Sequence, residues 1–244
     1  MPTFWIALGL SVLGGLGGLL IASGVLLVND SLRSKLVPEL VSYAVGALLG
    51  ISMMGLLPES LASLAPARVF ATLLGGILLF FILEKLVLWR HCHTHDCEVH
   101  ESTVASVMIG DTFHNFVDGA VIGAAVLTSV PLGVSTAIAI AAHEIPQELG
   151  DFAILLHAGY SRQKALLLNV LSALASVAGT IAAFLAFDFV PRTLPYFLVI
   201  AASSFLYVAM ADLIPGLHRG RTDASSLRQI VLIALGIATM VWFS

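Results

Sequence analysis

Long apolar stretches recur along the whole chain, and they constrain its fold more than any other feature. Each is roughly 20 residues long, the length that an α-helix needs to cross the hydrocarbon core of a bilayer. The sequence predicts eight such spans, at residues 4–28, 38–58, 67–88, 104–127, 133–156, 165–187, 194–214 and 228–243. The composition agrees, since 59% of the 244 residues are hydrophobic and 11% are charged. We therefore predict an all-α integral membrane protein in which residues 1–244 form a single transmembrane domain.

The basic residues predict the orientation of these spans. Of the 11 Lys and Arg residues, only Arg68 and Arg192 fall in one set of alternate loops. The opposite set of loops holds Arg33, Lys35, Lys85, Arg90, Arg162, Lys164, Arg219, Arg221 and Arg228. Because loops rich in Lys and Arg stay in the cytoplasm, both termini are predicted on the extracytoplasmic side. We expect a multi-pass protein of the inner cell membrane, with the lipid bilayer and no nucleic acid as partner.

Two neighbouring spans carry polar side chains where lipid is predicted. The histidine, carboxylate and amide residues of these two spans are Asp111, His114, Asn115, Asp118, His143, Glu144, Gln147, Glu148 and Asp151. A carboxylate at the centre of a span costs roughly 3 kcal/mol on the insertion scale. No Lys or Arg lies between Arg90 and Arg162 to neutralise these acids. Protons, cavity water or bound cations remain as partners, and the alternative is a set of satisfied polar contacts between helices.

Helical spacing groups these side chains into stripes, because residues three and four apart share a face. The two spans are antiparallel, which places Asp118 level with His143 and His114 level with Gln147. Imidazole, carboxylate and amide donors together favour Zn²⁺, Fe²⁺ or another first-row divalent ion over Mg²⁺. The predicted metal ligands are His114, Asn115, Asp118, His143, Glu144 and Gln147. The predicted exit path toward the cytoplasm consists of Asp111, Glu148 and Asp151.

A loop at residues 89–103 is rich in histidine and cysteine and is predicted to be cytoplasmic. Its candidate secondary metal ligands are His91, Cys92, His93, His95, Cys97 and His100. Thiols in the cytoplasm stay reduced, and thiolate with imidazole is a usual donor set for zinc. Because the spacing matches no closed tetrahedral site, we interpret the loop as a metal acceptor or sensor, with a merely polar loop as the alternative.

Two motifs resemble the fourth and fifth transmembrane signatures of the ZIP (Zrt/Irt-like) metal transporters. They are HNFVDG at residues 114–119 and HEIPQELGD at residues 143–151, and the eight spans and the His-rich loop also fit. The resemblance implies a ZIP-like bundle with a metal site between the fourth and fifth helices. It further implies import of a divalent metal into the cytosol, with an elevator-like movement of a four-helix unit.

The resemblance also implies which positions bind metal. Residues matching His114, Asp118, His143 and Gln147 would make one site, and residues matching Asn115, Asp118, Glu144 and Gln147 the other. A sixth-span ligand is left open among Asn169, Ser172 and Ser176. Gln147 stands where Glu or His is usual in the family. Because a neutral amide is a poor bridging ligand, the second site is expected to be weak or absent.

Other functions share some of these residues. His143 and Glu144 begin an H-E-x-x-H metalloprotease motif, but Gln147 stands at the required second histidine. A proton-coupled exporter would need the same ligands, and the sequence does not assign the direction of flux. Zinc is the first candidate substrate, with iron, manganese and cadmium as further ones. Ligands must lose protons to bind metal, so uptake is expected to depend on pH. A homodimer is left open.

Overall fold

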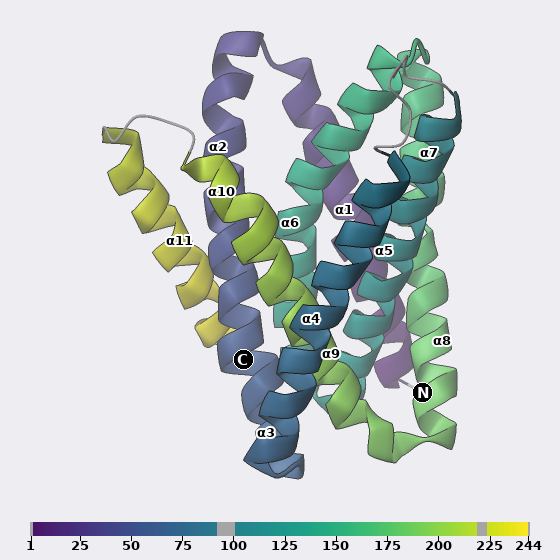
Figure 1. Cartoon of the computed structure of the whole chain (residues 1–244), viewed down its shortest axis with the longest axis vertical. Coiled ribbons are helices and arrows are strands. Elements are labelled where there is room, and N and C mark those ends of the chain that lie inside the picture. The colour runs from purple at the N-terminus through teal and green to yellow at the C-terminus, as the bar shows by residue number, and fades with distance from the viewer. Residues whose placement is uncertain (1, 92–100, 219–223, 244) are drawn as a thin grey trace.

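The computed structural model describes residues 2–91, 101–218 and 224–243, and this part of the chain is almost entirely helical, without a strand. The helices run up and down the molecule in an antiparallel bundle (Figure 1). They are α1 (Pro2–Leu27), α2 (Asp30–Gly50), α3 (Leu57–Ser63), α4 (Pro66–His91), α5 (Glu101–Thr128), α6 (Val130–His157), α7 (Arg162–Ala173), α8 (Ala175–Phe189), α9 (Leu194–Tyr207), α10 (Ile214–Leu217) and α11 (Ala224–Phe243). The predicted all-α fold class is confirmed.

Two of the rods contain a six-residue π-helix. The segment η1 (Ile51–Leu56) joins α2 to α3, and η3 (Val208–Leu213) joins α9 to α10, whereas a short 3₁₀ turn, η2 (Pro191–Thr193), precedes α9. Pro58 and Pro215 follow the two π segments within two residues. A proline ring lacks an N–H and crowds the carbonyl of the preceding turn. The wider π turn absorbs this conflict without breaking the rod.

Six helical stretches of the described chain are long and apolar enough to cross a membrane. They are Pro2–Leu27, Asp30–Ser63, Pro66–Lys85, Arg162–Phe189, Pro191–Leu217 and Ser226–Phe243. The helices α5 and α6 have 28 residues each, which is sufficient length, but they carry the polar residues that lower their hydropathy. Each of these six stretches overlaps a span that the sequence predicted. The total of eight spans stays a prediction.

The second span begins earlier than the hydropathy predicts. It starts at Asp30 rather than at residue 38, because the Asn29 side chain caps the helix by accepting the N–H of Leu32 at 2.9 Å. The first turns carry Arg33 and Lys35, which are too polar for an apolar window but compatible with a helix. Hydropathy indicates which residues are apolar enough to contact lipid. The start of the helix is set instead by its capping residue.

The helices form two groups that meet along the middle of the molecule (Figure 1). One group contains α1, α5, α6 and the α7–α8 rod, which pack against one another. The other contains α2, α4, α9 and α11, in which α2 packs on α11 and α4 packs on α9. The two groups touch where α6 contacts α2 and where α5 contacts α9. Both polar helices, α5 and α6, therefore belong to a single group.

Glycines let the helices of the first group approach closely. A Cβ atom placed on Gly18 of α1 would lie 2.8 Å from the Cβ of Glu144 in α6. Gly119 of α5 lies directly against the backbone of Ser176 in α8. Small residues permit such contacts between membrane helices. The close packing fixes the backbone that carries the polar side chains.

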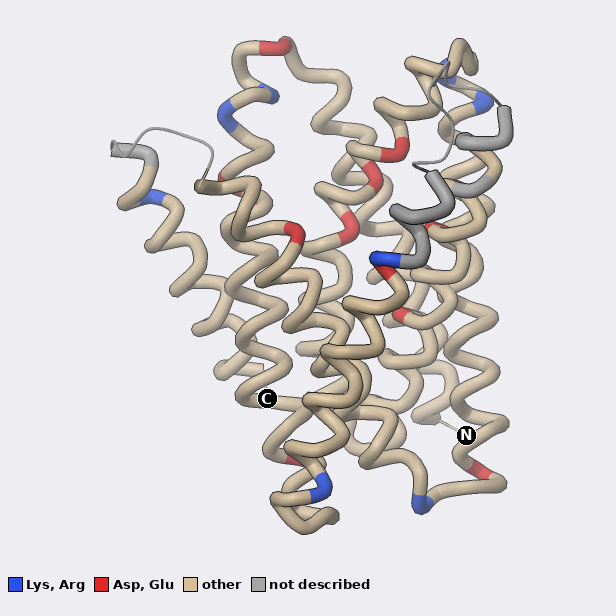
Figure 2. The backbone as a smooth tube through the Cα atoms, viewed as in Figure 1, with Lys and Arg blue, Asp and Glu red and all other residues tan. Residues whose placement is uncertain are grey.

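The two ends of the bundle differ in their content of basic residues (Figure 2). Basic residues gather at the end where α2 and α7 begin, including Arg33, Lys35, Arg162 and Lys164. Both chain termini lie toward the other end (Figure 1). The asymmetry that the sequence predicted is present in three dimensions. The membrane face to which each end belongs stays a prediction.

Candidate metal centre

Four of the predicted ligands converge between α5 and α6. His114 and Asp118 lie one turn apart on α5, and His143 and Glu144 are adjacent on α6. One ligand atom from each of these four residues can be chosen so that all lie within 4.8 Å of one another. We call these four residues the histidine cluster. Antiparallel packing of two polar stripes is sufficient to assemble it.

The distances within the histidine cluster suit a small cation. His143 Nε2 lies 3.1 Å from Asp118 Oδ2 and 3.2 Å from His114 Nε2. Glu144 Oε1 lies 3.5 Å from His114 Nε2 and 3.9 Å from His143 Nε2, and His114 Nε2 lies 3.7 Å from Asp118 Oδ2. Two ligands that are each about 2.0 Å from one zinc ion at a tetrahedral angle lie about 3.3 Å apart. The predicted level of Asp118 with His143 is confirmed.

The main chain fixes the tautomer of His143. Its Nδ1 lies 3.1 Å from the carbonyl oxygen of Ala139, an atom that can only accept a hydrogen bond. In the neutral ring the proton is therefore on Nδ1, which leaves the lone pair of Nε2 directed into the cluster. The ring also packs against Phe205 of α9, at 5.8 Å between centroids. The His114 side chain is 24% exposed and that of His143 only 2%, so the cluster opens on the side of His114.

The carboxylates of the histidine cluster have no Lys or Arg partner among the described side chains. Asp118 and Glu144 are buried, and neither oxygen of Glu144 accepts a hydrogen bond. Among the side chains that the structure describes, the ion pairs of Arg and Lys join Arg33 to Asp30 and Arg228 to Glu39, outside the cluster. Buried acids without a partner are costly. The alternative of fully satisfied contacts between helices does not hold for Glu144, and the donor set fits a divalent cation.

The other two predicted ligands meet around Asp111. The Asn115 side-chain amide donates to Asp111 Oδ1 and to the Asp111 main-chain carbonyl, both at 3.2 Å. The Gln147 amide donates to the same Oδ1 at 3.0 Å. We call Asp111, Asn115 and Gln147 the amide cluster. It adjoins the histidine cluster, since Asn115 follows His114 in sequence, but the hydrogen bond of Gln147 goes to Asp111 rather than to His114.

Further acids extend from the amide cluster toward the basic end of the bundle. Asp151 lies beside Asp111, and Glu148 is fully buried with neither oxygen accepting a hydrogen bond. A small apolar cluster follows them at this end of α5, α6 and α7, formed by Val104, Phe152, Leu155 and Ala165. The predicted exit residues therefore lie in a row. Their part in metal movement stays a prediction.

The three candidate ligands of the sixth span differ in their hydrogen bonds. Ser172 Oγ lies 3.2 Å from Thr112 Oγ1, and Ser176 donates to the carbonyl of Ala173 at 2.8 Å. Asn169 is fully buried, and neither its amide nitrogen nor its oxygen has a partner. Asn169 is therefore the candidate with free donor and acceptor atoms.

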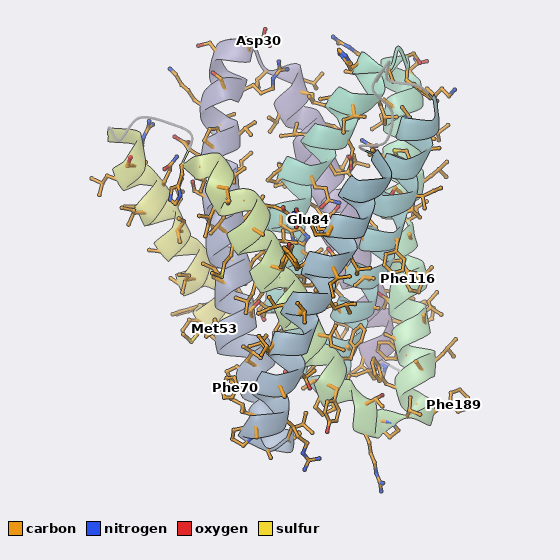
Figure 3. The ribbon with its side chains drawn as sticks, in the orientation of Figure 1. Asp30, Met53, Phe70, Glu84, Phe116 and Phe189 are labelled. Atoms are coloured by element: carbon orange, nitrogen blue, oxygen red, sulfur yellow. The ribbon has the colours of Figure 1, made fainter. Side chains whose placement is uncertain are left out.

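Sequence reasoning missed Glu84, an acid within a predicted span. Glu84 of α4 accepts a hydrogen bond from the Tyr207 hydroxyl of α9, and Figure 3 labels Glu84 near the middle of the molecule. Its position inside residues 67–88 was a usable signal. Of the predicted loop ligands, only His91 belongs to the described residues, as the last residue of α4. The remaining loop residues, Cys92, His93, His95, Cys97 and His100, lie outside the described residues.

The chain is similar in sequence to known zinc transporters. The family described as ZIP Zinc transporter matches residues 89–244. Zinc transporter ZIP13 of Pongo abelii is 35% identical over 225 residues, which cover 84% of this chain and 66% of the relative. Zinc transporter ZIP10 of Danio rerio is 39% identical over 132 residues, or 52% of this chain and 16% of the relative. Zinc transporter ZIP4 of Homo sapiens is 45% identical over 115 residues, or 47% and 18%. The chain thus spans two thirds or less of these relatives.

Proposed function

The chain belongs to the ZIP zinc transporter family, and from this premise we propose that it carries a divalent transition metal ion, with zinc as the first candidate, across the membrane. The histidine cluster is the observation that carries the proposal. One ligand atom from each of its four residues lies within 4.8 Å of the others, between α5 and α6.

The composition of the histidine cluster supports a borderline metal as substrate. Two imidazoles favour Zn²⁺, Fe²⁺ or Cd²⁺ over the hard ions Mg²⁺ and Ca²⁺, which prefer oxygen. Two carboxylates balance the double charge of the ion. A metal bound by Asp118 and Glu144 would therefore cross the bilayer with little net charge, which lowers the cost of placing it in a medium of low polarity.

The row of acids supports movement toward the basic end of the bundle. Asp111, Glu148 and Asp151 continue from the metal centre in this direction. The positive-inside rule assigns the basic end to the cytoplasm. We therefore propose import, with these acids as the exit path. A second metal would bind between the clusters, at Asn115 and Gln147 together with the shared carboxylates.

The grouping of the helices supports an elevator-like movement. All proposed ligands belong to α5 and α6, which lie in the group with α1, α7 and α8. The second group contributes the Phe205 ring, which packs against His143. A rigid movement of the first group would carry the bound ion with its complete ligand set. The second group would then serve as the fixed support.

Uptake into proteoliposomes tests this function. Purified protein would be supplied with Zn²⁺, Fe²⁺, Mn²⁺ or Cd²⁺, and accumulation inside the vesicles measured. We expect uptake of Zn²⁺ by the unaltered chain and loss of uptake with His143→Ala. His157→Ala is the matched control, because His157 lies at the exposed end of the same helix. Uptake by the His143 variant at the rate of the unaltered chain would contradict the proposal.

The alternatives are separated by chemistry and direction. ZIP family members are transporters, so the metalloprotease interpretation is set aside. Gln147, which replaces the required histidine, also turns its amide nitrogen toward Asp111. A proton-coupled exporter would use the same ligands. Cells that overproduce the chain should accumulate zinc if it imports, and should lose zinc if it exports.

A further inference from the structure

The orientation of the two amides in the amide cluster is determined by their partner. An amide group has a donating NH₂ and an accepting oxygen, and coordinates alone seldom distinguish the two ends. Here Asn115 approaches two atoms that can accept, namely the carboxylate and the main-chain carbonyl of Asp111. Gln147 approaches the same carboxylate oxygen at 3.0 Å. Both NH₂ groups must therefore face Asp111.

The oxygens of the same amides consequently point away from Asp111. Asn115 is 1% exposed, and its Oδ1 is buried without a hydrogen-bond donor. Its neighbour in sequence, His114, lies in the histidine cluster, and Gln147 lies one turn from His143 on α6. The Asn115 oxygen faces α1, where it lies 3.7 Å from a Cβ atom placed on Gly15, and Glu144 of the histidine cluster packs against Gly18, three residues further along the same helix.

We propose that Asp111 is a positioning residue that turns the carbonyl oxygens of Asn115 and Gln147 toward the second metal. This inference rests on the proposed function. A neutral amide is a weak bridging ligand when either end can face the ion. Fixing its orientation removes that disadvantage, and hydrogen bonds to a carboxylate increase the electron density on the amide oxygen. An amide replaces the Glu or His that is usual at position 147, and the acid at position 111 orients that amide.

The proposal predicts that positions 111 and 147 are coupled. Gln147→Glu in the unaltered background places a second carboxylate about where the amide nitrogen now lies, 3.0 Å from Asp111 Oδ1. The two acids repel each other, and the new side chain turns away. In the Asp111→Asn background the new Glu meets an amide that can donate to it. The same substitution should therefore weaken metal binding in one background and restore it in the other.

A double-mutant cycle on the full-length protein tests this coupling. Zn²⁺ binding would be measured by titration calorimetry of Asp111→Asn, Gln147→Glu, the double variant and the unaltered chain. We expect each single variant to lose roughly 10- to 100-fold in affinity for the second Zn²⁺, the usual effect of removing an outer partner of a metal ligand. The double variant should return to within about threefold of the unaltered chain. Asp188→Asn, an exposed acid of α8, is the control and should leave both sites unchanged.

Two outcomes would overturn the proposal. One is that Gln147→Glu changes the affinity for the second Zn²⁺ by the same factor in both backgrounds. Asp111 would then act independently of Gln147, either as a ligand itself or without a role in the site. The other is that Asp111→Asn leaves the second Zn²⁺ unaffected. Recovery in the double variant also shows that a loss in Asp111→Asn is not misfolding. Failure of the proposed function is distinguishable, since the unaltered chain would then neither bind Zn²⁺ at the histidine cluster nor transport it.

Discussion

The histidine cluster and the amide cluster occupy the same pair of helices but are oriented by different parts of the chain. In the histidine cluster, the main-chain carbonyl of Ala139 fixes the ring of His143. In the amide cluster, the side chain of Asp111 fixes Asn115 and Gln147. A carbonyl belongs to the helix itself and survives any side-chain substitution, whereas a carboxylate is lost with one. We therefore expect the first cluster to be robust and the second to be easily altered.

The two clusters also differ in the chemistry that they offer. Imidazole nitrogen occurs only in the histidine cluster, so the preference for a borderline metal resides there. The amide cluster offers oxygen alone and has little power to distinguish one divalent ion from another. The choice between metals is thus assigned to the histidine cluster, and the binding of a second metal ion to the amide cluster. A substitution in one cluster can therefore change its property without changing that of the other.

The largest effect is expected from removing a carboxylate of the histidine cluster. Asp118→Ala deprives the cluster of an oxygen that lies 3.1 Å from His143 Nε2, and of half its negative charge. Zn²⁺ uptake by proteoliposomes should fall at least about 100-fold, as expected when a direct ligand is lost. Uptake within twofold of the unaltered chain would remove Asp118 from the site. Asp188→Ala serves as the exposed control.

Acidic pH should weaken the histidine cluster next most strongly. Metal binding requires both imidazoles to be unprotonated, so protons compete with the ion as the pH falls. Zn²⁺ affinity should therefore be lower at pH 5.5 than at pH 7.5, by at most about tenfold per pH unit for each imidazole that takes up a proton. Calorimetric titration at both pH values measures it, and a pH-independent affinity would contradict binding by His114 and His143.

Selectivity should change when a nitrogen donor becomes an oxygen donor. His114→Asp keeps a ligand on α5 but leaves only one imidazole in the cluster. The ratio of Zn²⁺ to Mn²⁺ uptake should fall about tenfold, because oxygen donors favour the harder ion. Gln147→Asn, a change confined to the amide cluster, should reduce uptake of both metals without changing their ratio. A ratio that shifts only in the Gln147 variant would reverse the assignment of discrimination to the histidine cluster.

The smallest effect is expected from the helix contact behind the metal centre. Gly18→Ala places a methyl group 2.8 Å from the Cβ of Glu144, so α1 or α6 must shift. Zn²⁺ uptake should fall about three- to tenfold, in keeping with a small displacement of a ligand. Gly17→Ala is the matched control, since a Cβ there meets no atom within 4 Å. Equal uptake by both variants would show that the contact does not position Glu144.

Much of the site follows from spacing along two helices. Residues 114 and 118 share a helix face, and antiparallel spans bring Asp118 to His143, as the sequence predicts. The partner of Gln147 does not follow from spacing, because the choice between His114 and Asp111 depends on helix register within one turn. That register is set by packing contacts such as Gly18 on Glu144, which hydropathy does not encode.

The sequence predicted about as much of the fold as of the site. Apolar length located the spans, and the charge asymmetry anticipated which ends of the helices lie together. The π segments before Pro58 and Pro215 could not be derived, because a proline in a membrane helix is accommodated by a kink, a wider turn or a neighbouring donor. The bond between Tyr207 and Glu84 depends on the packing of α9 against α4, which the sequence does not specify.

X-ray absorption at the zinc edge tests the central claim most directly. The full-length protein would be loaded with one equivalent of Zn²⁺, and the first coordination shell determined for the unaltered chain and for His143→Ala. The account predicts nitrogen and oxygen ligands at about 2.0 Å, with the multiple scattering of two imidazoles that falls to one in the variant. A shell dominated by sulfur at about 2.3 Å, or an imidazole count that the variant leaves unchanged, would contradict it.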